Sequence, residues 1–452
     1  MIRAPYSREA LARRISLILL LGWPLAAVAS PAPSSVSLAG PWRFQLDRAD
    51  SGLEQRWFAR GLPDKVTLPG SLPAQGIGDD VTVDTKWTGG IVDKSWFTAP
   101  EYAKYRQPGN VKVPFWLQPD RYYAGTAWYQ RDFEIPAEWK DQRVVLSLER
   151  PHWETRVWVD HHLVGTNLSL STPHDYDLGT SLAPGQHQLS IRVDNRLVVD
   201  VGHDSHSVSD HTQGNWNGIV GRIELRTTPR VWIEDLRVYP HVATKSVTVK
   251  GRIGNATGQP GRGQVMLHAD YAALMKSAAE RKSLDVSWDS QGGAFETELP
   301  FDERNVLLWD EFNPILYNLA VFFPFDPKAP GKQYPSKTAT FGLREFTTQG
   351  TQFLINGRKT FLRGTLECCI FPRTGHPPVD VAEWKRIIGV VKLHGLNNLR
   401  FHSWCPPEAA FLAADELAST STSKFLPGPT RQPPSATASR WTSGSTRRQI
   451  GF

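Results

Sequence analysis

The stretch RVVLSLERPHWETRVWVDHHLVG, residues 143–165, is the clearest indication of the fold class of this chain. Val157 and Val159 are two positions apart, so they lie on the same face of an extended strand. Asp160 and the two histidines after it form a polar turn before a second short apolar run. This pattern predicts two antiparallel strands joined by a tight turn, a β-hairpin.

The same β pattern continues on both sides of the hairpin, from Trp42 to about Thr228. Short apolar runs alternate with Gly, Pro, Asn and Asp, which are typical of turns. Many short strands without long helices are typical of a sandwich or a jelly roll. We predict a jelly-roll domain over residues 30–228, with its clearest strands at 126–136, 143–150, 155–165, 187–195 and 221–226.

A second all-β segment follows over residues 229–343. A segment of this length with roughly seven short strands fits an immunoglobulin-like β-sandwich. No cysteine pair supports an antibody-type domain, since Cys368, Cys369 and Cys405 all come later and are predicted to be buried free thiols. The predicted strands lie at 231–240, 246–255, 263–271, 283–289, 293–300 and 316–325.

Over residues 344–418 the all-β pattern gives way to strands that alternate with helices. A strand at 360–371 precedes a helix at 380–395, for which Asp380 is the expected N-cap and Gly395 the expected C-terminal stop. A second strand at 396–404 and a second helix at 406–417 follow. Strand, helix, strand, helix is the order of a parallel α/β fold. We therefore expect two β/α units here, and the whole chain to be a mainly β multidomain protein.

The two ends of the chain differ from the middle. Residues 1–29 contain four arginines, a long apolar run and the small-residue site Ala27-Val28-Ala29, which predicts a signal peptide and export to the periplasm or the medium. Residues 419–452 contain five basic residues and no acid. The remaining chain carries a small negative charge, so the formal net charge of +6 indicates neither a nucleic-acid partner nor a membrane partner.

The segment 419–452 is rich in Ser, Thr, Pro and Arg and has almost no apolar periodicity. Such a composition predicts a disordered tail. Our hypothesis is that the tail is translated out of frame, through a frameshift in the gene or a sequencing error. The alternative is a genuine shorter product with a natural linker-like tail.

Several segments together resemble glycoside hydrolase family 2, which includes β-galactosidases, β-glucuronidases and β-mannosidases. The resemblance extends over about residues 40–418 and follows the family's order of domains. It implies a jelly-roll sugar-binding domain, an immunoglobulin-like domain and the start of a (β/α)₈ barrel. The segments are GPWRFQLD (40–47), WYQRDFEIP (128–136), the stretch quoted above, NWNGIVGRIEL (215–225), LLWDEFNPILYNL (307–319), FGLREF (341–346), FLINGRKTFLRG (353–364), VKLHGLNNLRFHSW (391–404) and AADEL (413–417).

The resemblance implies a retaining β-glycosidase, whose two glutamates lie about 5–5.5 Å apart. In the family both follow later barrel strands, the fourth and the seventh, so we predict no catalytic residue in this chain and an incomplete barrel. The expected function is that of a secreted β-glycosidase in a truncated form. The alternative function is non-catalytic carbohydrate binding. The expected partner in both cases is a β-linked glycoside.

Six residues are predicted to contact the sugar. The family resemblance suggests Asp210, Asn215 and Trp216, just before the last strand of the jelly roll, although Trp216 could instead pack inside the sandwich. Glu367 lies near the end of the first barrel strand, where it either contacts the substrate or supports a residue that does. Arg400 and His402 lie at the end of the second strand. For Arg400 the alternatives are a residue that lines the site and a member of a structural ion pair. For His402 they are a substrate contact and a core histidine. No metal ligand is predicted, because the histidine pairs lack partners at metal-binding spacing, and no motif indicates a cofactor or an oligomeric state.

Overall fold

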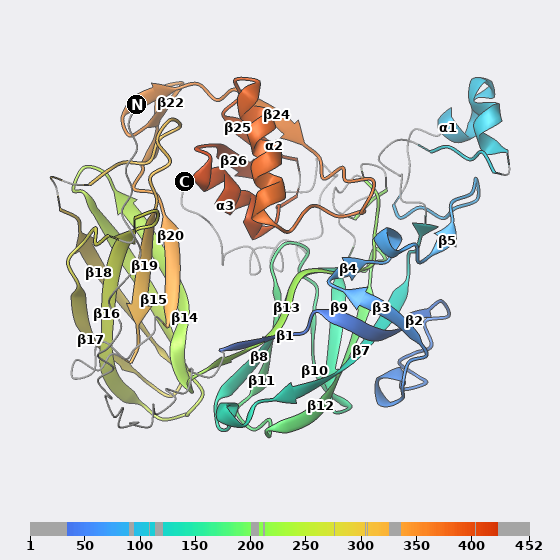
Figure 1. The fold of residues 1–452 in the computed structure, drawn as a ribbon, viewed down its shortest axis with the longest axis horizontal. Coiled ribbons are helices and arrows are strands. Elements are labelled where there is room, and N and C mark those ends of the chain that lie inside the picture. Colours follow the sequence, from blue (N-terminus) through green and yellow to red (C-terminus); the bar gives the residue numbers. More distant parts are fainter. Residues whose placement is uncertain are drawn as a thin grey trace, which may run out of the picture. The chain divides into compact units, whose positions relative to one another are not determined.

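The computed structural model describes residues 34–89, 95–107, 109–113, 121–199, 208–210, 213–274, 276–302, 304, 306–324, 336–402 and 404–423 (Figure 1). The predicted signal peptide and residues 424–452 lie outside this range. Strands dominate the described residues, which confirms the prediction of a mainly β chain. No helix in the described part is long and apolar enough to cross a membrane.

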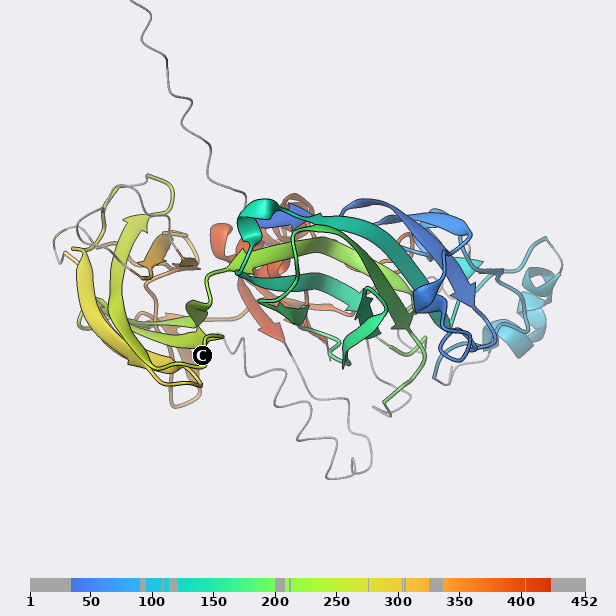
Figure 2. The ribbon, with the colours of Figure 1, turned by 90° about the horizontal axis from the view of Figure 1, so that it is seen from below.

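Residues 34–228 form two antiparallel sheets, drawn in blue to green in Figures 1 and 2. The predicted hairpin is confirmed, with Asp160 and His161 both at positive φ, +46° and +70°, as a two-residue hairpin turn requires. The first sheet contains β1 (Ser35–Ser37), β13 (Gly218–Thr228), β8 (Arg143–His152) and β11 (His174–Gly179), with β4 (Gly70–Ser71) beside β13. The second contains β10 (His162–Asn167), β9 (Glu154–Val159), β12 (Gly185–Asp194), β7 (Thr126–Ile135), β2 (Gly40–Asp47) and β3 (Asp64–Leu68).

One buried cluster draws side chains from both of these sheets, including Trp42, Leu146, Val157, Ile191 and Leu225. The two sheets therefore share a core, which accounts for the alternating apolar pattern of their strands. The connections carry short elements: η1 (Trp57–Ala59), η2 (Pro73–Gln75), the pair β5 (Asp79–Asp80) and β6 (Arg121–Tyr122), α1 (Ser95–Thr98), η3 (Pro100–Arg106) and η5 (Ala137–Trp139).

Residues 231–341 form a second pair of antiparallel sheets around their own buried cluster. The seven strands are divided three and four, and each strand predicted in this segment is present. The three-stranded sheet contains β14 (Val231–His241), β15 (Ser246–Asn255) and β18 (Gly293–Pro300). The four-stranded sheet contains β17 (Lys282–Trp288), β16 (Gly261–Tyr271), β19 (Tyr317–Phe322) and β20 (Lys337–Phe341).

The C-terminal segment begins with a small antiparallel sheet that the sequence did not predict, formed by β21 (Phe346–Gln349), β22 (Gln352–Ile355) and β23 (Arg358–Thr360). The predicted parallel strands follow as β24 (Gly364–Glu367) and β25 (Asn398–Phe401), separated by α2 (Val381–Leu393). The Asp380 side chain accepts the N–H of Glu383 at 2.8 Å and caps α2, as predicted. The second helix is α3 (Glu408–Glu416).

Ordered structure continues beyond the predicted end of this segment. Residues 420–423 form β26 (Thr420–Ser423), which pairs in parallel with β25. The prediction of a disordered tail from residue 419 is therefore wrong for these positions. Four Ser and Thr residues show no apolar alternation, and the strand is instead held by the backbone ladder and by the side chain of Asn398, which donates to Thr420 Oγ1 at 2.9 Å.

Phe401 is the central side chain of the core that joins this parallel sheet to its helices. It is fully buried, and the rings of Trp384 and Trp404 meet it edge-on at 5.8 and 5.2 Å. Truncation to Phe401→Ala is expected to lower local stability by about 3–5 kcal/mol, since it leaves a cavity. Hydrogen exchange should then accelerate in α2 and β25 and remain unchanged in β7 and β12. Leu393→Ala on α2 is the control, because that side chain is 86% exposed; an equal effect of both changes would contradict this packing.

Candidate functional site

The predicted site residues fall into two groups that the fold brings close together. Asp210, Asn215 and Trp216 precede β13, whereas the other three lie at the carboxyl ends of β24 and β25. Because these two strands are parallel, their carboxyl ends share one edge of the sheet.

Several contacts among the described residues join the strand ends to the first pair of sheets. Ser71 Oγ donates to the carbonyl oxygen of Thr374 at 2.7 Å. Arg150 Nη2 donates to the carbonyl oxygen of Cys405 at 3.0 Å. The rings of Trp216 and His376 lie 5.4 Å apart. We call this set of contacts the junction. It connects β4, β8 and the segment before β13 to the loops that follow β24 and β25.

Asp210 is fully buried and accepts hydrogen bonds from described residues in separate segments of the chain. Its carboxylate accepts the backbone N–H of Thr88 at 2.6 Å, the hydroxyl of Tyr122 at 2.6 Å and the backbone N–H of Asn215 at 2.7 Å. Burial raises the pKa of Asp210 to about 7, and these hydrogen bonds oppose part of that rise. Asp210 therefore fixes the position of two chain segments, and direct contact with a sugar stays a prediction.

Asn215 extends the same network toward His152. Its Nδ2 donates to Thr88 Oγ1 at 2.8 Å and to the carbonyl oxygen of Asn195 at 2.9 Å. Its Oδ1 lies 3.1 Å from His152 Nε2. Burial, and then the charge of Arg150, lower the pKa of His152 to about 3, so this ring is neutral. Since an amide oxygen only accepts, His152 holds its proton on Nε2.

Trp216 packs between protein rings at the junction. Only 4% of the residue is exposed, and the ring of His152 stacks on it at 4.7 Å. Gly375 lies beside it with φ +76°, and a Cβ atom there would come within 3.1 Å of Trp216 Cβ. The ring thus fits the protein closely, which favours packing over stacking on a sugar.

Glu367 ends β24 and links both loops. Its two carboxylate oxygens accept the backbone N–H of Cys369 at 3.0 Å each, and burial raises its pKa to about 7. Its carbonyl oxygen accepts the N–H of His402 at 2.8 Å and Trp404 Nε1 at 3.1 Å. A carboxyl group with a raised pKa can hold a proton near neutral pH, as a substrate contact or a proton donor requires.

Arg400 and His402 occupy different environments. Arg400 is exposed and lies in register with Leu366 on the sheet face opposite the buried Leu399 and Phe401. It forms no ion pair within the described part of the chain, so the structural ion-pair interpretation has no support there. His402 is partly buried, and its backbone is fixed by Glu367.

Sequence reasoning missed three residues of the junction: Arg150, His152 and His376. Arg150 is 8% exposed on β8, and burial lowers the pKa of its guanidinium. Burial and the charge of Arg150 also lower the pKa of His376. The signal was the polar run ERPH at 149–152, which interrupts an otherwise apolar strand.

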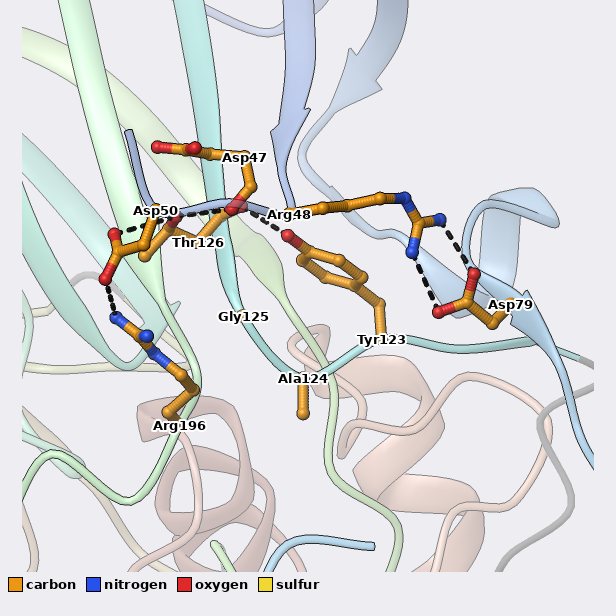
Figure 3. Close-up of a pocket in the computed structure, with 9 residues that line it drawn as sticks. All are labelled: Asp47, Arg48, Asp50, Asp79, Tyr123, Ala124, Gly125, Thr126 and Arg196. Atoms are coloured by element: carbon orange, nitrogen blue, oxygen red, sulfur yellow. Dashed lines mark hydrogen bonds and ion pairs between the residues drawn. The ribbon is translucent and has the colours of Figure 1, made fainter. Parts of the chain in front are cut away.

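A polar hollow of about 150 Å³ lies at the other end of β7 and β12 from the hairpin turn. Arg48 pairs with Asp79 at 2.8 Å and Arg196 with Asp50 at 2.6 Å, as Figure 3 shows. This volume is below the range of small-molecule sites, so the hollow suits ordered water better than a sugar. No group of acids, histidines or cysteines that could hold a metal ion is found among the described residues.

Comparison with known families matches residues 36–229 to the sugar binding domain of glycosyl hydrolases family 2. Curated relatives extend the similarity over most of the chain. Residues 36–229 thus form a sugar binding domain of glycosyl hydrolase family 2. A β-galactosidase of Arthrobacter sp. (strain B7) is 26% identical over 408 residues, which are 86% of this chain and 35% of the relative. A β-glucuronidase of Paenibacillus borealis is 24% identical over 344 residues, 72% of this chain and 48% of the relative.

Solved family 2 structures share the fold. A putative β-galactosidase from Bacteroides fragilis superposes with a TM-score of 0.65 at 16% identity, over 86% of this chain and 52% of that one. A β-glucuronidase from Ruminococcus gnavus superposes with a TM-score of 0.61 at 18% identity, over 87% of this chain and 59% of that one. The chain spans about a third to a half of the length of the two curated relatives.

The raised pKa values of two carboxyl groups predict how each of them makes stability depend on pH. Asp210 and Glu367 keep protons in the folded state that the unfolded state releases above about pH 4. The contribution of these two carboxyl groups to the free energy of unfolding should therefore fall as pH rises from about 4 to about 7, by up to about 1.4 kcal/mol per pH unit for each group. The buried His152 and His174, whose pKa values are lowered to about 3 and about 4, contribute in the opposite direction below about pH 6.5. Urea unfolding at a series of pH values measures this slope.

Glu367→Gln removes one of the two falling contributions and should make the slope of the unfolding free energy against pH more positive between about pH 4 and 7. The matched control is Glu54→Gln at an exposed acid, which should leave the slope unchanged. A Glu367→Gln protein with the unaltered slope would show that the carboxyl group is not protonated in the folded state.

Proposed function

We propose that this chain forms the N-terminal, sugar-facing part of a β-glycosidase. The observation that carries this proposal is the junction. The domain that matches the family's sugar-binding model contacts, through Arg150 and Trp216, the loops after β24 and β25. The carboxyl ends of parallel strands are where β/α enzymes place their sites.

The finer architecture in this proposal follows the family. The two sheets of residues 34–228 form its jelly roll, and the seven strands of residues 231–341 its immunoglobulin-like domain. The parallel strands β24, β25 and β26 with two intervening helices begin its (β/α)₈ barrel. Support comes from the three-and-four division of strands and from the burial of Leu399 and Phe401 against the helices. Residues 1–29 support export.

Retaining hydrolysis needs two carboxyl groups about 5–5.5 Å apart on either side of the scissile bond. Among the described parallel strands, only β24 carries a carboxyl group at its carboxyl end, Glu367. We therefore assign Glu367 to substrate contact, and not to the catalytic pair. The same observation supports the second candidate function, carbohydrate binding without hydrolysis.

Binding and turnover can be measured separately on the full chain. Nitrophenyl β-D-galactoside, β-D-glucuronide and β-D-mannoside serve as substrates, and the methyl glycosides serve as ligands for calorimetry. We expect saturable binding of at least one sugar and no release of nitrophenol. Hydrolysis that is lost in Glu367→Gln would contradict the assignment of Glu367. Absence of binding to every sugar would contradict the proposed function.

A further inference from the structure

A hollow of about 420 Å³ lies on the outer face of the three-stranded sheet formed by β14, β15 and β18. Small-molecule sites have volumes of about 300–1,000 Å³. The hollow falls within this range, whereas the polar hollow of Figure 3 is too small for it. Its size therefore admits a small ligand.

The register of the sheet explains how the hollow forms. Two rows of residues cross the three strands on the outer face: Arg237, Lys250 and Glu296 in one row, and Asp235, Arg252 and Ala294 in the other. The row between them points to the opposite face, where Leu236 and Phe295 join the core of this domain. The floor between the two outer rows is therefore backbone, with Gly251 on the central strand.

The charges along the two rows compensate one another. Lys250 pairs with Glu296 at 3.0 Å and Arg237 pairs with Asp235 at 2.9 Å. Arg252 pairs with Glu234 on β14. Ion pairs this close to solvent add little to stability. The walls of the hollow thus offer many donors and acceptors without an uncompensated charge, which suits a neutral polar ligand.

The backbone of the floor is already paired. β15 is the central strand of this sheet, and its residues pair with β14 on one side and β18 on the other. A peptide that binds by strand addition needs an unpaired edge, which this floor does not provide. A ligand in the hollow must consequently be recognised by side chains.

Tyr239 adds an aromatic surface to the hollow. Its ring is partly buried, and Lys250 Nζ lies 5.8 Å from the ring centre. The face of an aromatic ring packs well against the C–H groups of a sugar ring. A hydroxyl group both donates and accepts hydrogen bonds, so it can bridge a cation and the carboxylate paired with it. A carbohydrate combines the two properties that this hollow would recognise.

We propose that this hollow binds a neutral oligosaccharide, with one sugar ring against Tyr239 and its hydroxyl groups on Lys250, Glu296 and Arg252. The site shares no residue with the junction. The inference does not depend on the proposed function, because it concerns a different pair of sheets.

The test is electrophoresis of the full chain through native gels that contain galactomannan, xyloglucan or a β-1,3-glucan, with polygalacturonate as the acidic comparison. At least one neutral polysaccharide is expected to retard the chain, relative to a gel without polysaccharide. Tyr239→Ala should weaken this binding about tenfold. Ala294→Trp should weaken it as much, because the larger side chain fills the hollow from an exposed position. Phe312→Ala is the control, since it removes an aromatic ring that is 77% exposed elsewhere and should change nothing.

The outcomes separate this inference from the proposed function. Retardation by no neutral polysaccharide, or by polygalacturonate alone, overturns the inference. Retardation that persists in folded Tyr239→Ala and Ala294→Trp proteins also overturns it. If Tyr239→Ala does not fold, Ala294→Trp decides, because it removes no contact. Calorimetry with the methyl glycosides tests the proposed function in the same proteins, and these affinities should be equal in the wild-type chain and in Ala294→Trp. Retardation without any methyl glycoside binding overturns the proposed function and leaves this inference standing.

Discussion

The hydrogen bond from Arg150 to the carbonyl oxygen of Cys405 joins residues that are 255 positions apart in the sequence. It connects β8, inside a sandwich with its own core, to the loop after β25, which belongs to a different core. Neither core alone fixes where that loop lies. The junction does so, because the carbonyl of Glu367 also accepts His402 N and Trp404 Nε1 and thereby holds the loops after β24 and β25 together.

The second pair of sheets supports the C-terminal segment from another side. Trp309, which is fully buried, donates through Nε1 to the carbonyl oxygen of Asp415 near the end of α3 at 2.9 Å. The guanidinium of Arg344 lies 4.3 Å from the Trp309 ring and 3.5 Å from the Asp415 carboxylate. The helix is thus anchored at its C-terminal end, while the loops at the carboxyl ends of the strands are anchored by the first pair of sheets.

The features that the sequence predicted are those that depend on residues close to one another in the chain. The hairpin at 143–165, the Asp380 cap and the two helices each follow from spacing or from a capping residue within a few positions. The roles of Arg150 and His376 could not be predicted in this way, because each depends on a partner from a distant part of the chain. The strand Thr420–Ser423 escaped detection for another reason, since a polar strand held by backbone hydrogen bonds leaves no apolar pattern.

Burial is the largest cause of the pKa shifts at and around the junction. A carboxyl group, a thiol or an imidazole can avoid the penalty of burial by becoming neutral, and Asp210, Glu367 and His152 all shift in that direction. A guanidinium has no neutral form within reach, so Arg150 stays charged in spite of its burial. This charge lies at the edge where the two parallel strands β24 and β25 end.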